Sequence, residues 1–221
     1  ISINSSSFSS ETRYQKENSV TRIFDENVSR ETSDKLTLFA NIVEKWTPKI
    51  NLISKASVPY IWQRHIEDSI QIYSLVPPVS SWVDLGSGGG FPAIVVALLA
   101  QQDGRNSKFT LVESDQRKCV FLRTAIRELG LKVEVLNDRI ENIPPLEANV
   151  VSARALAELP LLIGLASRHM KSDGIAIFPK GKNWKVEDAK ARKSWAYSNE
   201  SIPSKTDPSA AILKIKEIKH V

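Results

Sequence analysis

Asp84-Leu85-Gly86-Ser87-Gly88-Gly89-Gly90-Phe91-Pro92 joins two mostly apolar stretches of this chain. The stretch before it, 81–85, is short like a buried parallel strand, and the stretch after it, 91–100, is apolar throughout like a buried helix. Glycine adopts positive φ and lacks a Cβ, so a glycine-rich turn lets the backbone approach a ligand closely. Proline is favoured in the first turn of a helix. The sequence therefore predicts a strand, a ligand-binding turn and a helix, in that order.

Short β-rich stretches and longer helical ones alternate from this turn onward. That alternation is typical of an α/β protein with a mostly parallel sheet and helices on both faces. Gly130 stands where the glycine that follows a helix belongs. In the last strand apolar residues alternate with lysines, so we expect one of its faces to be solvated. We expect strands at 81–85, 108–113, 132–137, 149–154, 174–178 and 210–218, and helices at 92–101, 116–129 and 155–169.

Two further helices are expected before the first strand. One is capped by Thr32 or Ser33 and stopped by Pro48, and its apolar residues have helical spacing. The other starts near Pro59 and ends at about residue 75. The Ser-rich N-terminus lacks the basic and apolar regions of a signal peptide. The predicted organisation is a flexible tail at 1–30, a helical cap at 31–80 and one α/β domain at 81–221.

The composition narrows the class of protein. Residues 1–170 carry 19 basic and 19 acidic side chains, whereas residues 171–221 carry 11 basic and 6 acidic ones, so the net charge of +5 arises in the last part of the chain. A basic patch suits a polyanion such as nucleic acid, although it can equally serve solubility. Cys119 is the one cysteine and the three histidines lie far apart, which argues against disulfides and metal sites. No stretch reaches the ~20 apolar residues of a membrane helix, so we expect a cytoplasmic protein.

The glycine turn and two carboxylates indicate the cofactor. In an α/β sheet the ligand lies where the first strand turns into its helix. A dinucleotide fingerprint needs a third glycine at position 91, which is Phe91, and Asp84 would repel a pyrophosphate. Asp84 can instead offset the positive charges of S-adenosylmethionine. Glu113 ends the next strand and can accept both ribose hydroxyls of either cofactor. The predicted S-adenosylmethionine site comprises Asp84, Gly86, Gly88, Gly90 and Glu113, with the loop at 138–141 near the adenine.

The loop after the fourth predicted strand, Ser-Ala-Arg-Ala at 152–155, is where the acceptor chemistry is expected. It lacks the Asn/Asp-Pro-Pro-aromatic motif that holds an exocyclic amine. Methylation of a pyrimidine carbon needs a cysteine nucleophile, and Cys119 falls within a helix, where it is expected in the core. An acceptor that is already nucleophilic remains, such as N7 of guanine. Arg154 can donate to guanine O6 and N7, hold a phosphate, hold the cofactor carboxylate, or form a structural ion pair.

The chain resembles the bacterial RsmG family, also called glucose-inhibited division protein B, from about residue 35 to the C-terminus. The resemblance implies a Rossmann-like class I methyltransferase fold with a seven-stranded, mostly parallel sheet and an N-terminal helical extension. It also implies methyl transfer from S-adenosylmethionine to N7 of a guanine in 16S ribosomal RNA. The motifs that carry it are Asn-Leu-Ile-Ser at 51–54, Arg-His-Ile-Glu-Asp-Ser at 64–69, the turn at 83–92, Val-Glu-Ser at 112–114, Ser-Ala-Arg-Ala at 152–155 and Lys-Gly at 180–181.

By this resemblance, Gly86 and Phe91 line the cofactor, Ile140 and Glu141 contact its adenine side, and Arg154 is the catalytic residue between cofactor and acceptor. The spacing of Arg64, His65 and Asp68 places them on one helical face, where they can bridge the helical cap and the sheet edge, with a structural role for His65. The expected RNA contacts are Arg64, Lys180, Lys182 and Lys185, with Trp184 and Trp195 nearby as packing residues.

Two alternatives remain open at this point. One is a nicotinamide-dependent oxidoreductase of Rossmann type, and the other is an RNA-binding protein without catalytic activity. The expected partner is 16S ribosomal RNA or the small ribosomal subunit particle. The protein is expected to be a monomer without membrane attachment.

Overall fold

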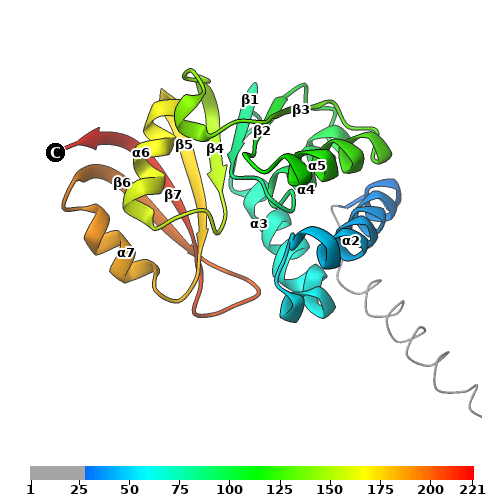
Figure 1. Cartoon of the computed structure of the whole chain (residues 1–221). Coiled ribbons are helices and arrows are strands. Elements are labelled where there is room, and N and C mark those ends of the chain that lie inside the picture. The colour runs from blue at the N-terminus through cyan, green and yellow to red at the C-terminus, as the bar shows by residue number, and fades with distance from the viewer. Residues whose placement is uncertain (1–27) are drawn as a thin grey trace, which may run out of the picture.

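The computed structural model describes residues 28–221, so the tail predicted at 1–30 lies almost wholly outside the described residues. One seven-stranded sheet runs through the molecule in the order β3-β2-β1-β4-β5-β7-β6 (Figure 1). Strands β1 to β5 are parallel, and β7 lies antiparallel to both β5 and β6. The strands are β1 Ser81–Leu85, β2 Lys108–Val112, β3 Val133–Leu136, β4 Ala148–Ala153, β5 Met170–Lys180, β6 Trp195–Pro203 and β7 Ala211–His220. The sheet confirms the predicted α/β class, and its seven strands are the number that the family resemblance implied, one more than the local patterns indicated.

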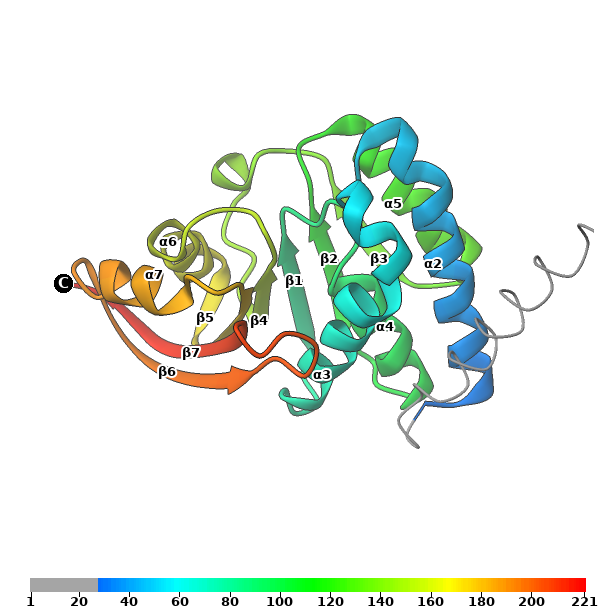
Figure 2. The ribbon, with the colours of Figure 1, turned by 90° about the horizontal axis from the view of Figure 1, so that it is seen from below.

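Helical elements precede the sheet and cover both of its faces (Figure 2). Helices α2, α4 and α5 share one buried cluster, whereas α6 and α7 pack against the cluster on the other face. The α-helices are α2 Arg30–Ile50, α3 Asp68–Ser74, α4 Ala93–Gln102, α5 Gln116–Glu128, α6 Leu159–His169 and α7 Trp184–Ala191. The other helical segments are the 3-10 helices η1 Lys55–Tyr60 and η3 Ile140–Asn142 and the π-helix η2 Trp62–Glu67.

The N-terminal helices differ from their predicted bounds. Ser29 caps α2, because its side chain accepts a hydrogen bond from the backbone N–H of Thr32, so the caps predicted at Thr32 or Ser33 were wrong. Pro48 does not stop α2, which continues to Ile50 and ends where Asn51 takes a left-handed conformation. The helix predicted to start at Pro59 is instead a succession of the three elements η1, η2 and α3.

Two further predictions required correction. Helix α6 begins at Leu159 rather than at residue 155, because Ala155 has a φ of 51°, which a helix does not accommodate. Strand β7 does not alternate simply, since Ile212 and Leu213 are both buried. Strand β6 and helix α7 were not predicted as elements, because their apolar residues are sparse and mixed with charged ones.

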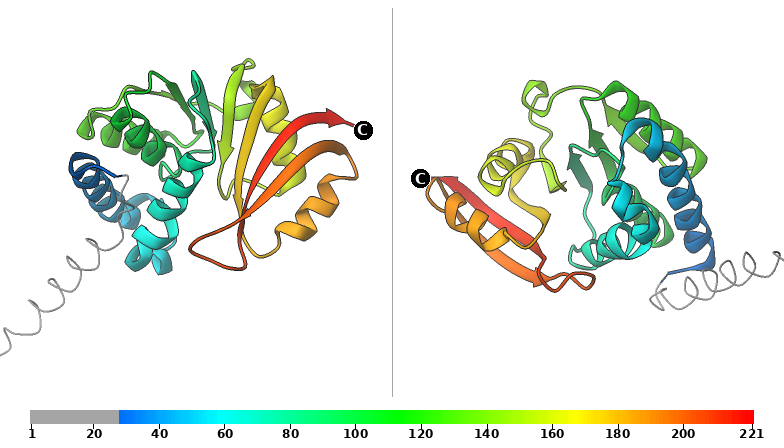
Figure 3. Two further views of the ribbon diagram at one scale, coloured as in Figure 1. Left: turned by 180° about the vertical axis from the view of Figure 1, so that it is seen from behind. Right: turned by 60° about the horizontal axis from the view of Figure 1, so that its bottom comes forward.

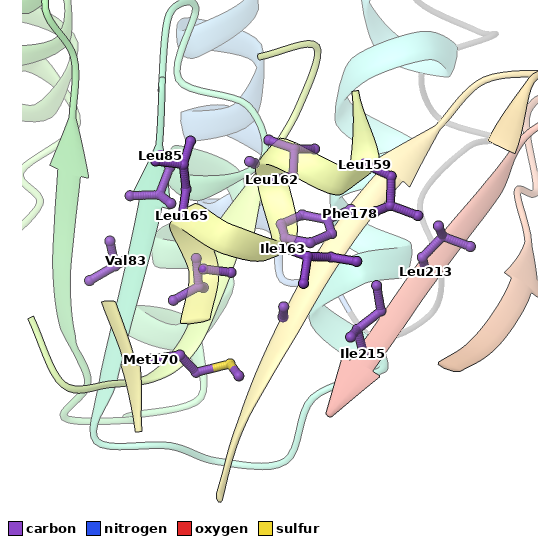
Figure 4. Close-up of a cluster of buried hydrophobic side chains, with 14 of the residues drawn as sticks. Val83, Leu85, Leu159, Leu162, Ile163, Leu165, Met170, Phe178, Leu213 and Ile215 are labelled. Carbon is purple, nitrogen blue, oxygen red and sulfur yellow. The ribbon is translucent and has the colours of Figure 1, made fainter. Parts of the chain in front are cut away.

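The core of the sheet is packed on both faces. Figure 4 shows the cluster on the α6 face, in which Leu162 and Ile163 of α6 lie against Leu85 of β1 and Phe178 of β5. The other face buries all of α4 from Ala93 to Ala100, so the apolar stretch after the glycine turn is a core helix. Burying side chains of this size contributes about 1.5–3 kcal/mol each, which holds the glycine turn on a rigid base.

Helix α2 and the β6–β7 hairpin lie at opposite ends of the sheet (Figure 3). The loop between β6 and β7, at 204–210, nevertheless reaches back to α3, where Gln71 donates to the carbonyl of Pro203 and accepts from the backbone N–H of Lys205. The carboxyl ends of β4 and β5 are therefore bordered by both the N-terminal helices and the C-terminal hairpin. Among residues 28–221, no helix is long and apolar enough to cross a membrane.

Candidate functional site

The glycine turn lies at the carboxyl end of β1, between β2 and β4. The strand order reverses at this point, because β2 and β3 are added on one side of β1 and β4 and β5 on the other, and ligands of α/β proteins bind at such a switch. Gly86, Gly88 and Gly90 have φ values of 67°, 50° and 82°, which confirms the predicted left-handed turn. A Cβ at Gly88 would meet no atom nearer than 3.7 Å, so that glycine keeps the space above the turn open. Gly90 instead packs against Ile94 beneath the turn.

Glu113 joins β2 to the glycine turn. Its Oε2 accepts a hydrogen bond from the backbone N–H of Gly88 at 2.9 Å, and its Oε1 accepts one from the N–H of Asp115 at 2.8 Å. A carboxylate offers about four acceptor positions, so each oxygen can accept another hydrogen bond. Glu113 thus both fixes the turn and presents acceptors to a ligand above it.

Two cavities lie side by side along the glycine turn and share Gly86, Gly88, Lys118 and Ala155. The strand-end cavity, of about 320 Å³, runs from the turn toward η3 and α6. Its wall includes Glu113 together with apolar side chains of the two helical segments. The residues that give it this mixed polar and apolar character are Glu113, Asp138, Ile140, Glu141, Leu161 and Leu165.

The loop cavity, of about 400 Å³, lies on the other side of the turn, against η1 and η2. Backbone at Gly88 and Gly89, the ring of Phe91 and the Lys118 side chain line it. Cationic and hydroxyl groups predominate around it: Arg64, Lys118 and Arg154, with Ser54, Ser57 and Ser87. The two cavities together form a trough along the glycine turn, with apolar side chains at one end and cationic side chains at the other.

Asp84 lies beneath the turn and lines neither cavity. It is 1% exposed, its Oδ1 accepts a hydrogen bond from the hydroxyl of Ser152 at 2.6 Å, and its Oδ2 is buried without a hydrogen-bond partner. Burial raises the pKa of Asp84 to about 7, hydrogen bonds from Ser152 and Ser87 oppose the rise, and the charge of Glu113 adds to it. Any effect of Asp84 on a ligand, by direct contact or through its charge, therefore stays a prediction.

Arg154 connects three parts of the protein. It follows β4, and its Nη2 donates to the backbone carbonyl of Arg64 at 2.6 Å and lies 3.8 Å from Oδ2 of Asp68. This confirms that the segment at 64–68 bridges the N-terminal helices and the sheet edge. The second terminal nitrogen, Nη1, is buried and has no hydrogen-bond partner. Burial lowers the pKa of Arg154, opposed by the charge of Asp68, but an arginine stays protonated at neutral pH.

His65 is held as a neutral ring. Burial lowers its pKa to about 3, and the charges of Arg154 and Arg64 lower it further. The ring lies against that of Phe91 with centroids 5.0 Å apart, and both of its nitrogens are buried without hydrogen-bond partners. A histidine with this pKa does not act as an acid near pH 7. The packing supports the structural role expected for it.

A third cavity, here called the outer cavity, lies on the far side of Arg154 from the glycine turn and measures about 430 Å³. Arg64 and Arg154 line it as well as the loop cavity. Its remaining wall comes from α3, the end of β5 and the β6–β7 loop, through Asp68, Lys180, Ser204, Thr206 and Asp207. Arg154 thus separates a trough along the glycine turn from a polar cavity that opens toward the basic end of the chain.

The predicted RNA-contact residues fall into two groups. Lys180 is largely buried: its Nζ lies 2.6 Å from Oε2 of Glu187 and donates to the carbonyl of Ala157 at 3.0 Å. Its ammonium is therefore engaged within the protein, whereas Lys182 and Lys185 are exposed. Trp184 and Trp195 pack at the edge of the core cluster on the α6 face, and Cys119 is fully buried, as expected.

Sequence reasoning missed several residues of the site. Lys118 lines both cavities of the trough and lies in the first turn of α5. Its position five residues after Glu113 is the signal that could have found it. Ser204 and Thr206 are about fifty residues from Arg154 in the chain, and no local pattern relates them to it.

A family model described as rRNA small subunit methyltransferase G matches residues 32–213. A protein of Ruegeria pomeroyi named ribosomal RNA small subunit methyltransferase G is 50% identical over 195 residues, covering 88% of this chain and 96% of that protein. A protein of the same name from Cereibacter sphaeroides is 53% identical over 196 residues, covering 88% and 95%. The residues matched by the family model include strands β1 to β6, the start of β7 and every residue that lines the three cavities.

Solved structures that resemble this fold have low sequence identity to the chain, and several of them are named as methyltransferases. A SAM-dependent methyltransferase from Aquifex aeolicus gives a TM-score of 0.54 at 15% identity, covering 73% of this chain and 94% of that one. Cofactor-bound Rv0187 from MTB gives a TM-score of 0.58 at 13% identity, covering 83% and 90%. At such identities the resemblance establishes the Rossmann-like fold alone.

Proposed function

The chain belongs to the rRNA small subunit methyltransferase G family, and from this premise we propose that it transfers the methyl group of S-adenosylmethionine to N7 of a guanine in 16S ribosomal RNA. The enzyme class and the methyl donor follow from the family. Guanine N7 is the acceptor that the resemblance of the sequence implies. Family membership argues against a nicotinamide-dependent oxidoreductase.

The trough suits S-adenosylmethionine. The apolar strand-end cavity, with Ile140 at its wall and Glu113 at its mouth, has the character of an adenosine site. The loop cavity has cations and hydroxyls for a carboxylate, and the bare backbone of Gly88 leaves space between the two cavities that a Cβ would occupy. We propose that Gly86, Gly88, Phe91, Glu113, Ile140, Glu141 and Arg154 hold the cofactor in these cavities, and that Asp84 and Gly90 support them from beneath.

The chemistry demands little proton movement. The cofactor supplies an electrophilic methyl group on a cationic sulfur. Guanine N7 has a lone pair and no proton, so its attack forms the new carbon–nitrogen bond as the carbon–sulfur bond breaks and its electron pair stays on sulfur. The protein then contributes mainly alignment, which is worth up to about 7–11 kcal/mol in well-oriented reactions. Because this reaction needs no general base, it is compatible with a His65 ring that is neutral and packed against Phe91.

Arg154 is the observation that carries the proposal. Its side chain lines both the loop cavity and the outer cavity, so a base in the outer cavity and a methyl group in the trough would meet beside it. The unpartnered Nη1 has a donor free for the acceptor base or for the cofactor carboxylate. Either use makes Arg154 a contact of the reacting groups.

The RNA chain would continue over the basic C-terminal part of the protein. Lys182 and Lys185 are exposed and follow Gly181 of the outer cavity in the chain, so they can neutralise phosphates, and Arg64 lines the cavity itself. Because Lys180 is paired with Glu187, we propose that it shapes the cavity wall and contributes less to RNA affinity than Lys182 and Lys185.

We also propose that residues 31–80 form a cap on a methyltransferase domain at 81–221, since the backbone of Arg64 and the side chain of Asp68 contact Arg154. We further propose that the protein is a monomer. Ribosomal RNA as substrate supports a cytoplasmic location. Light scattering of the purified protein, alone and with cofactor, tests the monomer.

Transfer of labelled methyl groups to small-subunit RNA and to small-subunit particles that lack the modification tests the function. We expect one guanine to be labelled, and mapping of the modified nucleotide identifies it. Arg154→Ala should lower the rate while keeping the melting temperature close to that of the wild type. If the wild-type protein binds S-adenosylmethionine and RNA but labels neither substrate, a non-catalytic RNA-binding role is favoured instead.

A further inference from the structure

We propose that Asp68 reads the base of the acceptor nucleotide and, together with Arg154, selects guanine over adenine. This inference rests on the proposed function, because it assigns a specificity-determining residue to the same acceptor site. The outer cavity, at about 430 Å³, lies within the ~300–1,000 Å³ typical of small-molecule pockets.

The Asp68 carboxylate is held in place by the C-terminal hairpin. Its Oδ1 accepts hydrogen bonds from the hydroxyls of Ser204, at 3.2 Å, and Thr206. Figure 2 shows the loop between β6 and β7 beside α3, which brings these hydroxyls to the first residue of that helix. The side chain is 17% exposed, so it faces the cavity from a fixed position.

The other oxygen of Asp68 is available to a ligand. Oδ2 lies 3.8 Å from Nη2 of Arg154, which is too long for a hydrogen bond. Arg154 is already held by the carbonyl of Arg64 at 2.6 Å. The outer cavity therefore presents a carboxylate acceptor next to a guanidinium donor, and each group also has its own hydrogen bonds to the protein.

This order of groups matches one purine. Guanine carries the acceptor O6 next to the donors N1–H and N2–H₂, whereas adenine carries the donor N6–H₂ next to the acceptor N1. A carboxylate only accepts and a guanidinium only donates, so guanine pairs with both groups and adenine opposes both. N7 neighbours O6 on the base, so a guanine whose O6 faces Arg154 turns N7 toward the loop cavity, where the methyl group is expected.

A purely structural role for Asp68, holding Arg154 through charge, is the competing explanation. It predicts that loss of the carboxylate slows methylation of every base by the same factor. Base reading predicts a change in selectivity, because a site built around specific hydrogen bonds rejects a base that leaves them unpaired. Selectivity is therefore the quantity to measure.

The test compares single-turnover methylation of particles that carry guanine, adenine or 1-methylguanine at the mapped position. Asp68→Asn should lower the guanine rate about 10- to 100-fold without lowering the adenine rate, since the amide can donate to adenine N1. The guanine-to-adenine ratio should fall by the same factor. Thr206→Val, which keeps the carboxylate, should preserve the ratio, and Asp173→Asn, an exposed carboxylate at the start of β5, should leave both rates unchanged.

The wild-type protein also tests the idea without any variant, since 1-methylguanine keeps O6 and N7 but has no N1–H. We expect the wild type to methylate it at least 10-fold more slowly than guanine. Equal rates on the two bases, or equal losses for guanine and adenine in Asp68→Asn, would overturn base reading. Absence of methyl transfer by the wild type to the guanine particle would instead refute the proposed function itself.

Discussion

Asp84 allows a direct test of whether a buried carboxylate lowers the stability of the fold while its charge favours cofactor binding. Its folded-state pKa is raised to about 7 from 3.8. For an acid whose pKa rises on folding, the cost to stability is absent below the unfolded pKa, grows as the pH rises and is complete above the folded pKa. At about 1.36 kcal/mol for each pH unit, the cost grows by roughly 2.5 kcal/mol between pH 5 and pH 8.

Asp84→Asn removes this ionisation but keeps an oxygen for the Ser152 hydroxyl. The variant should therefore gain stability relative to the wild type as the pH rises, by about 2.5 kcal/mol from pH 5 to pH 8. Urea denaturation of both proteins at pH 5, 6, 7 and 8 measures this difference. A difference in unfolding free energy that stays constant over this range would show that Asp84 does not titrate as its burial requires.

The same variant should bind S-adenosylmethionine less tightly. A cationic cofactor above the turn favours the ionised carboxylate, so wild-type affinity should rise with pH by up to about 10-fold per unit below pH 7. In Asp84→Asn that rise should vanish. Calorimetric titration with the cofactor at the same four pH values gives both slopes, and parallel slopes in the two proteins would contradict an electrostatic role for Asp84.

Three other substitutions separate fold from function. Gly88→Ala should weaken cofactor binding at least 10-fold in titration calorimetry, because an alanine at a φ of 50° costs ~1 kcal/mol and its Cβ enters the trough. Gly130→Ala is the control, since Gly130 has a φ of 64° and open space around it, and this variant should lower only the stability of the fold. Lys180→Met should lower the unfolding free energy by about 1–3 kcal/mol, since it leaves the largely buried Glu187 carboxylate and the Ala157 carbonyl without their hydrogen-bond donor. Lys182→Ala should leave stability unchanged and weaken RNA binding in a filter assay, and the reverse pattern would contradict the assignment. Glu113→Gln should weaken the charge-assisted hydrogen bond to the glycine turn and reduce cofactor affinity by about 1.5–3 kcal/mol, and an unchanged dissociation constant would exclude Glu113 from the cofactor site.

Local patterns were sufficient for the centre of the sheet. Strand β1 has its predicted bounds, and the three glycines take the positive φ that their spacing indicated. Such features depend on neighbours in the chain: an apolar run, a turn that only glycine tolerates and a proline at the helix start. The helix after β4 was placed too early, because nothing in the local pattern reveals that Ala155 is left-handed.

The part of the trough that residues 84–92 and Glu113 form was thus predicted from the sequence, because the roles expected for these residues follow from short-range geometry. The outer cavity was not, because its walls come from segments more than a hundred residues apart. Asp68 meets Ser204 and Thr206 only when the hairpin folds back onto α3, and Lys180 and Glu187 are a largely buried pair only once α7 packs against α6. Long-range packing decides which charges are free to meet RNA, and a linear pattern carries no record of it.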